Sequence, residues 1–162
     1  ASVKAALDDF RLLAEVLNAA DSTDGAAPAL ELIVRRLGAA GGLLALVGPG
    51  RGRWAVRASD AGVERLAEGP VHDGGLVDRV VASGRRERGS GRPPGEVSGG
   101  RLPFLAVPLA VGAATIGCLA LWRCTAFGEE ECELLRSLGV HLAPVLRGRS
   151  RGDEREDAPA PP

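Results

Sequence analysis

The sequence predicts an α/β fold of the α+β type within a single domain, because helical and strand patterns follow each other in blocks along 162 residues. Three observations support this prediction. Residues 1–20 place apolar side chains at helical spacing from residue 3 onward, and residues 128–147 do the same. Between them, residues 102–122 form an apolar run with the character of strands. We expect the domain to cover residues 1–147, followed by a charged, proline-rich tail or linker over 148–162.

The apolar run has no charged side chain between Leu102 and Trp122, which is long enough for a membrane span. Two interior prolines and several glycines make a packed helix unfavourable, and no excess of basic residues on one flank would orient such a span. Alternating side chains instead predict strands at 104–111 and 115–123 joined by a tight turn, a hairpin at the centre of a sheet. Pro108 suggests a bulge or a local edge there.

The remaining elements are shorter. Proline near its start and glycine at its end indicate a helix over 28–37, and two apolar runs around GPGRG predict a first hairpin. The expected set is a hairpin of strands 43–47 and 54–58, short helices over 61–68 and 75–83, and a short strand near 86–88 within the loop 85–101.

Composition excludes several function classes. A net charge of -1 gives no electrostatic reason to expect nucleic acid or a membrane surface as partner. Three cysteines without a CxxC pair predict reduced thiols and a cytoplasmic location, and the N-terminus shows no targeting segment. With only two histidines, a metal site is not expected.

Three stretches resemble a GAF domain, the small-molecule sensor module of signalling proteins. They are ALELIVRRLGAAGGLLALVGPGRGRWAVRAS, GGLVDRVVASGRRERG, and the segment from Phe104 to Leu146. The third is the most specific, through Val107-Pro108-Leu109, Gly117 followed by Cys118-Leu119, and Phe127 with Glu130-Glu131. The resemblance covers about residues 10–147. It implies a central antiparallel sheet of about five to six strands, with terminal helices on one face and a ligand cavity under short helices and loops on the other.

Each ligand class of this family implies its own residues. A covalent bilin implies a cysteine over the cavity, and residues 60–101 contain none. A cyclic nucleotide implies an Asn-Lys pair, whereas Asn18 and Lys4 are the only residues of their types. A haem would imply an axial histidine, but His72 is better explained as a solvated loop residue and His141 as a packing residue. We therefore expect no cofactor.

Enzymes of this fold that reduce free methionine sulfoxide carry reactive thiols in loops. Here Cys118, Cys124 and Cys132 fall in a strand, at its end and in the last helix, where they resemble small buried hydrophobes. We therefore predict that the protein is not an enzyme.

An arginine cluster is the remaining candidate site, and guanidinium groups suit carboxylate or phosphate ligands. The candidate ligand-binding residues are Arg57, His72, Asp73, Asp78, Arg79 and Arg86. The alternative is a solvated charged face, in which Asp78 and Glu87 pair with the arginines.

The wide apolar faces of the first and last helices predict a homodimer, as the resemblance also implies. The expected interface residues are Leu7, Phe10, Leu13, Leu17, Leu134, Leu138, His141, Leu142 and Val145. These observations favour a sensory or regulatory domain of a bacterial-type signalling protein that binds a small ligand, with anions as the favoured class, and signals through the helical interface. A GAF fold without a ligand, serving as a dimerisation or protein-interaction scaffold, is the alternative.

Overall fold

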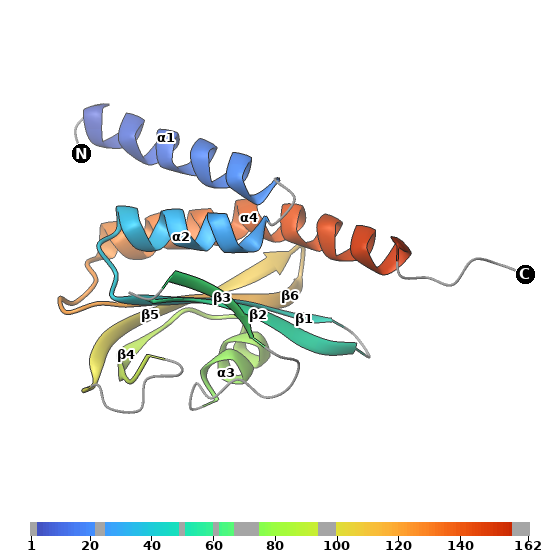
Figure 1. The fold of residues 1–162 in the computed structure, drawn as a ribbon. Helices are drawn as coiled ribbons and strands as arrows, with labels where there is room; N and C mark the ends of the chain where they lie inside the picture. Colours follow the sequence, from blue (N-terminus) through green and yellow to red (C-terminus); the bar gives the residue numbers. More distant parts are fainter. Residues whose placement is uncertain are drawn as a thin grey trace, which may run out of the picture.

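The computed structural model describes residues 3–21, 25–48, 51–59, 62–66, 75–93 and 100–156. Four helices and six strands lie in these ranges (Figure 1). In chain order they are α1 Val3–Ala20, α2 Ala26–Arg36, β1 Gly41–Gly48, β2 Arg51–Ser59, β3 Gly62–Leu66, α3 Leu76–Ser83, β4 Glu87–Gly91, β5 Leu102–Val111, β6 Ala114–Trp122 and α4 Glu129–Glu156. The predicted fold class is confirmed.

The strands form one sheet in the order β3-β2-β1-β6-β5-β4, and each pair of neighbours is antiparallel. Both predicted hairpins are present, β1–β2 and β5–β6. Their inner strands, β1 and β6, pair along Gly41–Leu46 and Gly117–Trp122. Apolar strands therefore lie at the centre of the sheet, where both of their faces are covered.

Helices α1, α2 and α4 lie on one face of the sheet and α3 lies on the other (Figure 1). Two separate apolar clusters follow from this arrangement. The larger one joins the buried sides of α1, α2 and α4 to one face of the sheet, and the smaller one joins α3 to the opposite face. The period-two alternation of the strands supplies side chains to both clusters.

Two glycines allow the helices of the larger layer to approach the sheet closely. A Cβ atom at Gly42 would lie 2.7 Å from Val34 and 3.0 Å from Leu30, both in α2. A Cβ atom at Gly139 in α4 would lie 3.2 Å from the carbonyl oxygen of Pro108 in β5. At both positions a larger residue would push a helix away from the sheet.

Pro108 occupies the kind of place that its chemistry requires. Pairing between β4 and β5 ends at Ala106, so no residue of β4 is opposite Pro108, which has no N–H to donate. The register shift in the hairpin lies beyond it, between Leu109 and Ala110. The predicted local edge is therefore at Pro108 itself, and the irregularity follows one residue later.

Two expectations about local structure are wrong. Residues 62–66 form strand β3 and not part of a helix, because they pair with residues 55–59 of β2 and so extend the sheet. Helix α4 continues past residue 147 to Glu156, where a tail was expected. Pro144 is tolerated inside α4 because it and Val140, the residue four positions earlier, are both exposed, so water reaches the carbonyl left without an N–H.

The run at 102–122 is a β-hairpin and not a membrane span. Among the residues that the structure describes, no helix is both long and apolar enough to cross a bilayer.

Candidate functional site

Helix α3 covers the second face of the sheet. Its left-handed glycines, Gly75 before the helix and Gly84 after it, define its two ends. The buried members of the cluster beneath it, here called the α3-side cluster, are Leu43, Ala45, Leu76, Val77, Val80, Phe104, Ala106, Cys118, Ala120 and Trp122. Because small side chains form much of the sheet surface, α3 packs closely against it.

Trp122 is the largest side chain of the α3-side cluster. It lies beside Phe104, with ring centroids 6.1 Å apart and the planes tilted by 41°. In the register of the sheet, Gly41 is opposite Trp122 on one side, and Gly89 is opposite Phe104 on the other. An aromatic pair thus lies between two positions that have no side chain.

The indole nitrogen of Trp122 has no hydrogen-bond partner among the described residues, although the side chain is only 1% exposed. Buried polar groups are nearly always paired, and an unpaired donor costs about 1–3 kcal/mol. Sequence reasoning placed Trp122 in a strand and assigned it no role. The structure adds its register partners, Gly41 in β1 and Phe104 in β5.

Three of the predicted ligand-binding residues lie on the α3 side. Arg57 is paired in register with Leu43, so the two share a face of the sheet, and Asp78 and Arg79 belong to α3. The Arg79 guanidinium donates to the Glu87 carboxylate, with Nε 3.1 Å from Oε1. The expected pairing between an arginine of the cluster and Glu87 is therefore confirmed. His72 and Asp73 lie outside the described residues.

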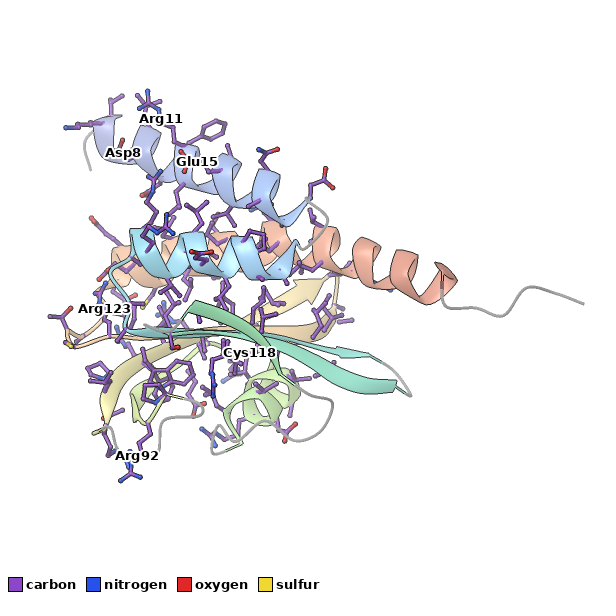
Figure 2. All side chains as sticks on the ribbon, in the orientation of Figure 1. Asp8, Arg11, Glu15, Arg92, Cys118 and Arg123 are labelled. Carbon is purple, nitrogen blue, oxygen red and sulfur yellow. The ribbon has the colours of Figure 1, made fainter. Side chains whose placement is uncertain are left out.

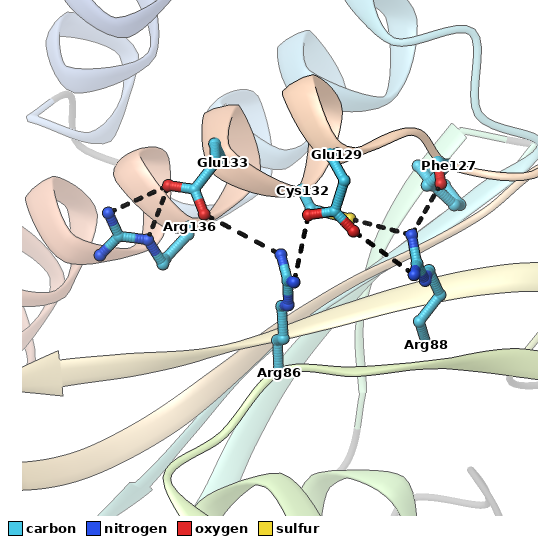
Figure 3. Close-up of polar contacts among 7 residues, drawn as sticks. All are labelled: Arg86, Arg88, Phe127, Glu129, Cys132, Glu133 and Arg136. Atoms are coloured by element: carbon cyan, nitrogen blue, oxygen red, sulfur yellow. Dashed lines mark hydrogen bonds and ion pairs between the residues drawn. The ribbon is translucent and has the colours of Figure 1, made fainter.

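Arg86 does not converge with these residues. Its guanidinium binds two carboxylates of α4, at 3.2 Å from Glu129 and 3.9 Å from Glu133, and Glu133 also binds Arg136 (Figure 3). It thus points to the helix on the opposite side of the sheet from α3. The grouping of Arg86 with Arg57 and Arg79 is wrong, because the next residue, Glu87, is in register with Ala106 of the α3-side cluster and the preceding side chain points to the α4 face.

Arg88, in edge strand β4, reaches the start of the same helix (Figure 3). It donates to the backbone carbonyl of Phe127 at 3.1 Å, approaches the Cys132 sulfur at 3.7 Å and pairs with Glu129 at 3.5 Å. The segment that follows α3 therefore contacts the first turns of α4 through two arginines.

Arg123 also holds the start of α4, from the end of strand β6. It follows Trp122 directly, and its guanidinium donates to both oxygens of Glu131 and lies 4.2 Å from the centre of the Phe127 ring. Further acceptors are the backbone carbonyls of Leu37, Thr125 and Ala126. We call Arg123, Phe127 and Glu131 the α4 clamp; its labelled arginine is seen near the start of α4 in Figure 2.

The clamp changes the titration of its carboxylate. The hydrogen bond from Arg123 lowers the pKa of Glu131, burial opposes this effect, and the N–H of Gly128, 3.1 Å away, lowers the pKa further. The same contact with Glu131 raises the pKa of the Arg123 guanidinium. Sequence reasoning placed Glu131 in the first helical turn and, with Phe127, in the family motif, but gave it no partner. Nothing in the sequence pairs it with an arginine eight residues earlier.

The three thiols differ in exposure. Cys118, labelled in Figure 2, and Cys132 are buried as expected, whereas Cys124 is exposed, which corrects the expectation that it is a buried hydrophobe. Strand β6 ends before Cys124, so this residue has no apolar layer to enter. Within the described ranges, no three histidine, cysteine or acidic side chains are grouped as a metal site would require.

The predicted interface residues separate into two groups. Leu138 and Leu142 are fully buried against the sheet, and Leu13, Leu17, Leu134 and Val145 are partly buried against the same core. The assignment of Leu138 and Leu142 to an interface is wrong, because the side of α4 that carries them faces its own sheet. Leu7 and Phe10 of α1 are 51% and 68% exposed, and His141 is exposed with Nδ1 2.8 Å from the Ser137 carbonyl oxygen.

A family profile described as the GAF domain matches residues 19–147, most of the described chain. The chain belongs to the GAF domain family. GAF domains are sensory domains of signalling proteins, and the α3 side of this GAF domain is where the family resemblance implies a ligand. Among curated proteins, no match was found.

Solved structures show the same fold at low identity. The GAF domain of a phosphoenolpyruvate-protein phosphotransferase from Coxiella burnetii matches with a TM-score of 0.63 and 18% identity, over 91% of this chain and 98% of that one. Free methionine-R-sulfoxide reductase from Neisseria meningitidis, solved with its substrate, matches with a TM-score of 0.63 and 17% identity over 94% and 95%. The GAF domain of a putative sensor histidine kinase from Pseudomonas syringae pv. tomato gives 0.56 and 19%, over 94% and 95%.

Proposed function

We propose that this GAF domain is a sensory or regulatory module that binds a small ligand on the α3 side and passes the change to the terminal helices. It acts without catalysing a reaction. Family membership supports the sensory role. The contacts between the α3 side and the start of α4 support the direction in which the change travels.

The observation that carries the proposal is that the two segments leaving the α3 side both end on the first turns of α4. Helix α3 leads through Arg86 into β4 and Arg88, which bind Glu129 and the Phe127 carbonyl. Strand β6 carries Trp122 into the α3-side cluster, and the next residue, Arg123, binds Glu131 within the α4 clamp. A ligand that repacks α3 would therefore alter the contacts that position α4.

The contacts of Arg86 and Arg88 with α4 are weaker than the contact of Arg123 with Glu131. The ion pairs of Arg86 and Arg88 with Glu129 are each more than a third exposed, so each contributes only about 0–1 kcal/mol and is exchanged at little cost. The side chain of Arg123 is 12% exposed and forms a two-oxygen contact with Glu131. The clamp holds the helix start while Arg86 and Arg88 exchange partners, which suits a population shift between two arrangements.

We also propose that a second copy of the chain covers the outer face of α1. Val3, Leu7 and Phe10 are exposed apolar side chains on a helix whose other side packs on the core through Leu12 and Val16. Large apolar side chains in solvent are typical of an interaction surface. A symmetric pair of α1 helices would place the terminal helices at the interface.

The scaffold without ligand remains the second candidate. It is favoured by the complete burial of Val77, Ala106 and Cys118, which shows that side chains already fill the space between α3 and the middle of the sheet. In that case the exposed face of α1 would be the functional surface.

Native mass spectrometry of the protein as purified distinguishes the ligand-binding sensor from the scaffold without ligand. The sensor proposal predicts a dimer with a reproducible additional mass, or a dimer that gains one on incubation with a metabolite extract. A dimer that takes up no small molecule under either condition would favour the scaffold.

The α1 interface has its own test. Phe10→Asp should convert the dimer to a monomer, and Asn18→Asp, at an exposed position of the same helix, is the control. A monomeric unmodified protein would refute the interface.

A further inference from the structure

The unpaired indole of Trp122 indicates what kind of ligand the α3 side accepts. An indole N–H can only donate a hydrogen bond, so its complement must be an acceptor atom. Trp122 is buried in the α3-side cluster and has no acceptor among the described residues. A ligand that brings an acceptor to the indole satisfies a donor that has no partner among the described residues.

The surroundings of the indole favour an uncharged acceptor. Its neighbours in the cluster are aliphatic and aromatic, including Phe104 with its ring centroid at 6.1 Å. An ionised carboxylate in such surroundings would need several donors to offset its desolvation, whereas a carbonyl oxygen is satisfied by one.

Two of the three arginines first expected to bind an anion have carboxylate partners within the protein. Arg79 binds Glu87, and Arg86 binds Glu129 and Glu133 across the sheet edge. Each therefore already has carboxylate partners, which an anionic ligand would have to displace. Within the described part of the chain, the buried polar group of the α3-side cluster without a hydrogen-bond partner is the neutral N–H of Trp122.

We propose that the Trp122 Nε1–H donates a hydrogen bond to the carbonyl oxygen of an uncharged, largely apolar ligand bound against Trp122 and Phe104 on the α3 side of the sheet. This rests on the proposed sensory function and replaces the anionic class with a neutral carbonyl compound. The aromatic pair of Trp122 and Phe104 provides the apolar contact, and the indole N–H fixes the orientation of the carbonyl.

Three small probes of similar shape test this proposal. Acetophenone carries the carbonyl, α-methylstyrene replaces its oxygen by a CH₂ group, and benzoate carries a charge. Each is titrated into uniformly ¹⁵N-labelled protein while the two indole N–H resonances are followed by NMR. Spectra of Trp54→Phe and Trp122→Phe assign the resonances, and Trp54 is the matched control.

Acetophenone should move the Trp122 resonance downfield in a saturable manner and bind about fivefold or more tightly than α-methylstyrene, the discrimination expected for one hydrogen bond. Trp122→Phe should abolish that discrimination and Trp54→Phe should preserve it. An unmoved Trp122 resonance at the solubility limit of acetophenone, equal binding of both probes by the unmodified protein, or a preference for benzoate would each overturn the proposal.

The titration on the unmodified protein stands even if Trp122→Phe fails to fold. Failure of the proposal about Trp122 can also be distinguished from failure of the sensory function. A small molecule retained in native mass spectrometry, together with an indole that acetophenone does not move, would preserve the sensor and refute the role of Trp122.

Discussion

The α4 clamp makes a quantitative prediction about Arg123. Replacing Arg123 by alanine removes an arginine that is largely buried and contacts the Glu131 carboxylate, the Phe127 ring and several carbonyl groups. The carbonyls of Thr125 and Ala126 lie at exposed positions where water can replace the guanidinium, so they contribute little to the cost.

The magnitude follows from the remaining contacts. A hydrogen-bonded ion pair of this exposure contributes about 1.5–3 kcal/mol. The cation–π contact, with the guanidinium 4.2 Å from the Phe127 centroid, adds about 0.5–1 kcal/mol. Arg123→Ala should therefore lower the free energy of unfolding by about 2–4 kcal/mol. For a chain of this length, that corresponds to a fall in Tm of about 5–15 °C.

Urea denaturation at neutral pH, followed by circular dichroism, measures this difference. Arg35→Ala is the matched control, because Arg35 pairs with Glu31 four residues earlier and the two side chains are 70% and 53% exposed. That pair should contribute less than about 0.5 kcal/mol. A double-mutant cycle with Glu131→Gln isolates the ionic contact and should give a coupling of about 1–2 kcal/mol. If Arg123→Ala is no more destabilising than Arg35→Ala, the clamp does not hold the helix start.

Two further predictions follow from the same helix. The pKa of Glu131 is lowered in the folded state, so its contribution to stability is complete above its ordinary value of 4.5 and is lost as the pH falls through the folded value. Urea midpoints between pH 6 and 2.5 should therefore fall less steeply below pH 4.5 in Glu131→Gln than in the unmodified protein, and parallel profiles would exclude the effect. Gly148→Ala should stabilise α4 by about 0.5–1 kcal/mol, since nothing lies within 4 Å of its new Cβ atom. Gly139→Ala should lack this gain, because its Cβ atom would lie 3.2 Å from the Pro108 carbonyl oxygen, and equal thermal shifts for the two glycine variants would contradict the close packing of α4 on β5.

The elements with a strong period could be predicted from the sequence. Helix α1 and the β5–β6 hairpin follow patterns sustained over at least eight residues, and such patterns report directly which side chains share a face. Strand β3 could not be predicted in this way. Its five residues are too few to establish either period, and only the available edge of β2 decides that they are extended.

The site was harder to predict than the fold because it depends on pairings between distant residues. The arginines near α3 were recognised as a cluster, yet Arg79 and Arg86 bind different partners on opposite sides of the sheet. Trp122 and Arg123 are consecutive, and the alternation of a strand sends them to different layers.

The dimer face illustrates the same difficulty on a helix. A wide apolar stripe shows that α4 has two kinds of neighbours, but not which leucines face which neighbour. Leu138 and Leu142 face the sheet, whereas the exposed Val140 lies between them in the sequence and faces away. Only the position of α4 relative to β5 resolves this, and that position is set by the close approach at Gly139.

The central claim is that packing on the α3 side is coupled to the start of α4 through Arg86 and Arg88. Amide hydrogen exchange followed by mass spectrometry tests it in Val77→Ala, which removes buried contacts of α3. We expect exchange over residues 132–138 to accelerate more than exchange over α2, and we expect this excess to vanish when Arg86 and Arg88 are also replaced by alanine. Acceleration confined to α3 and β4, with residues 132–138 unchanged relative to α2, would contradict the coupling.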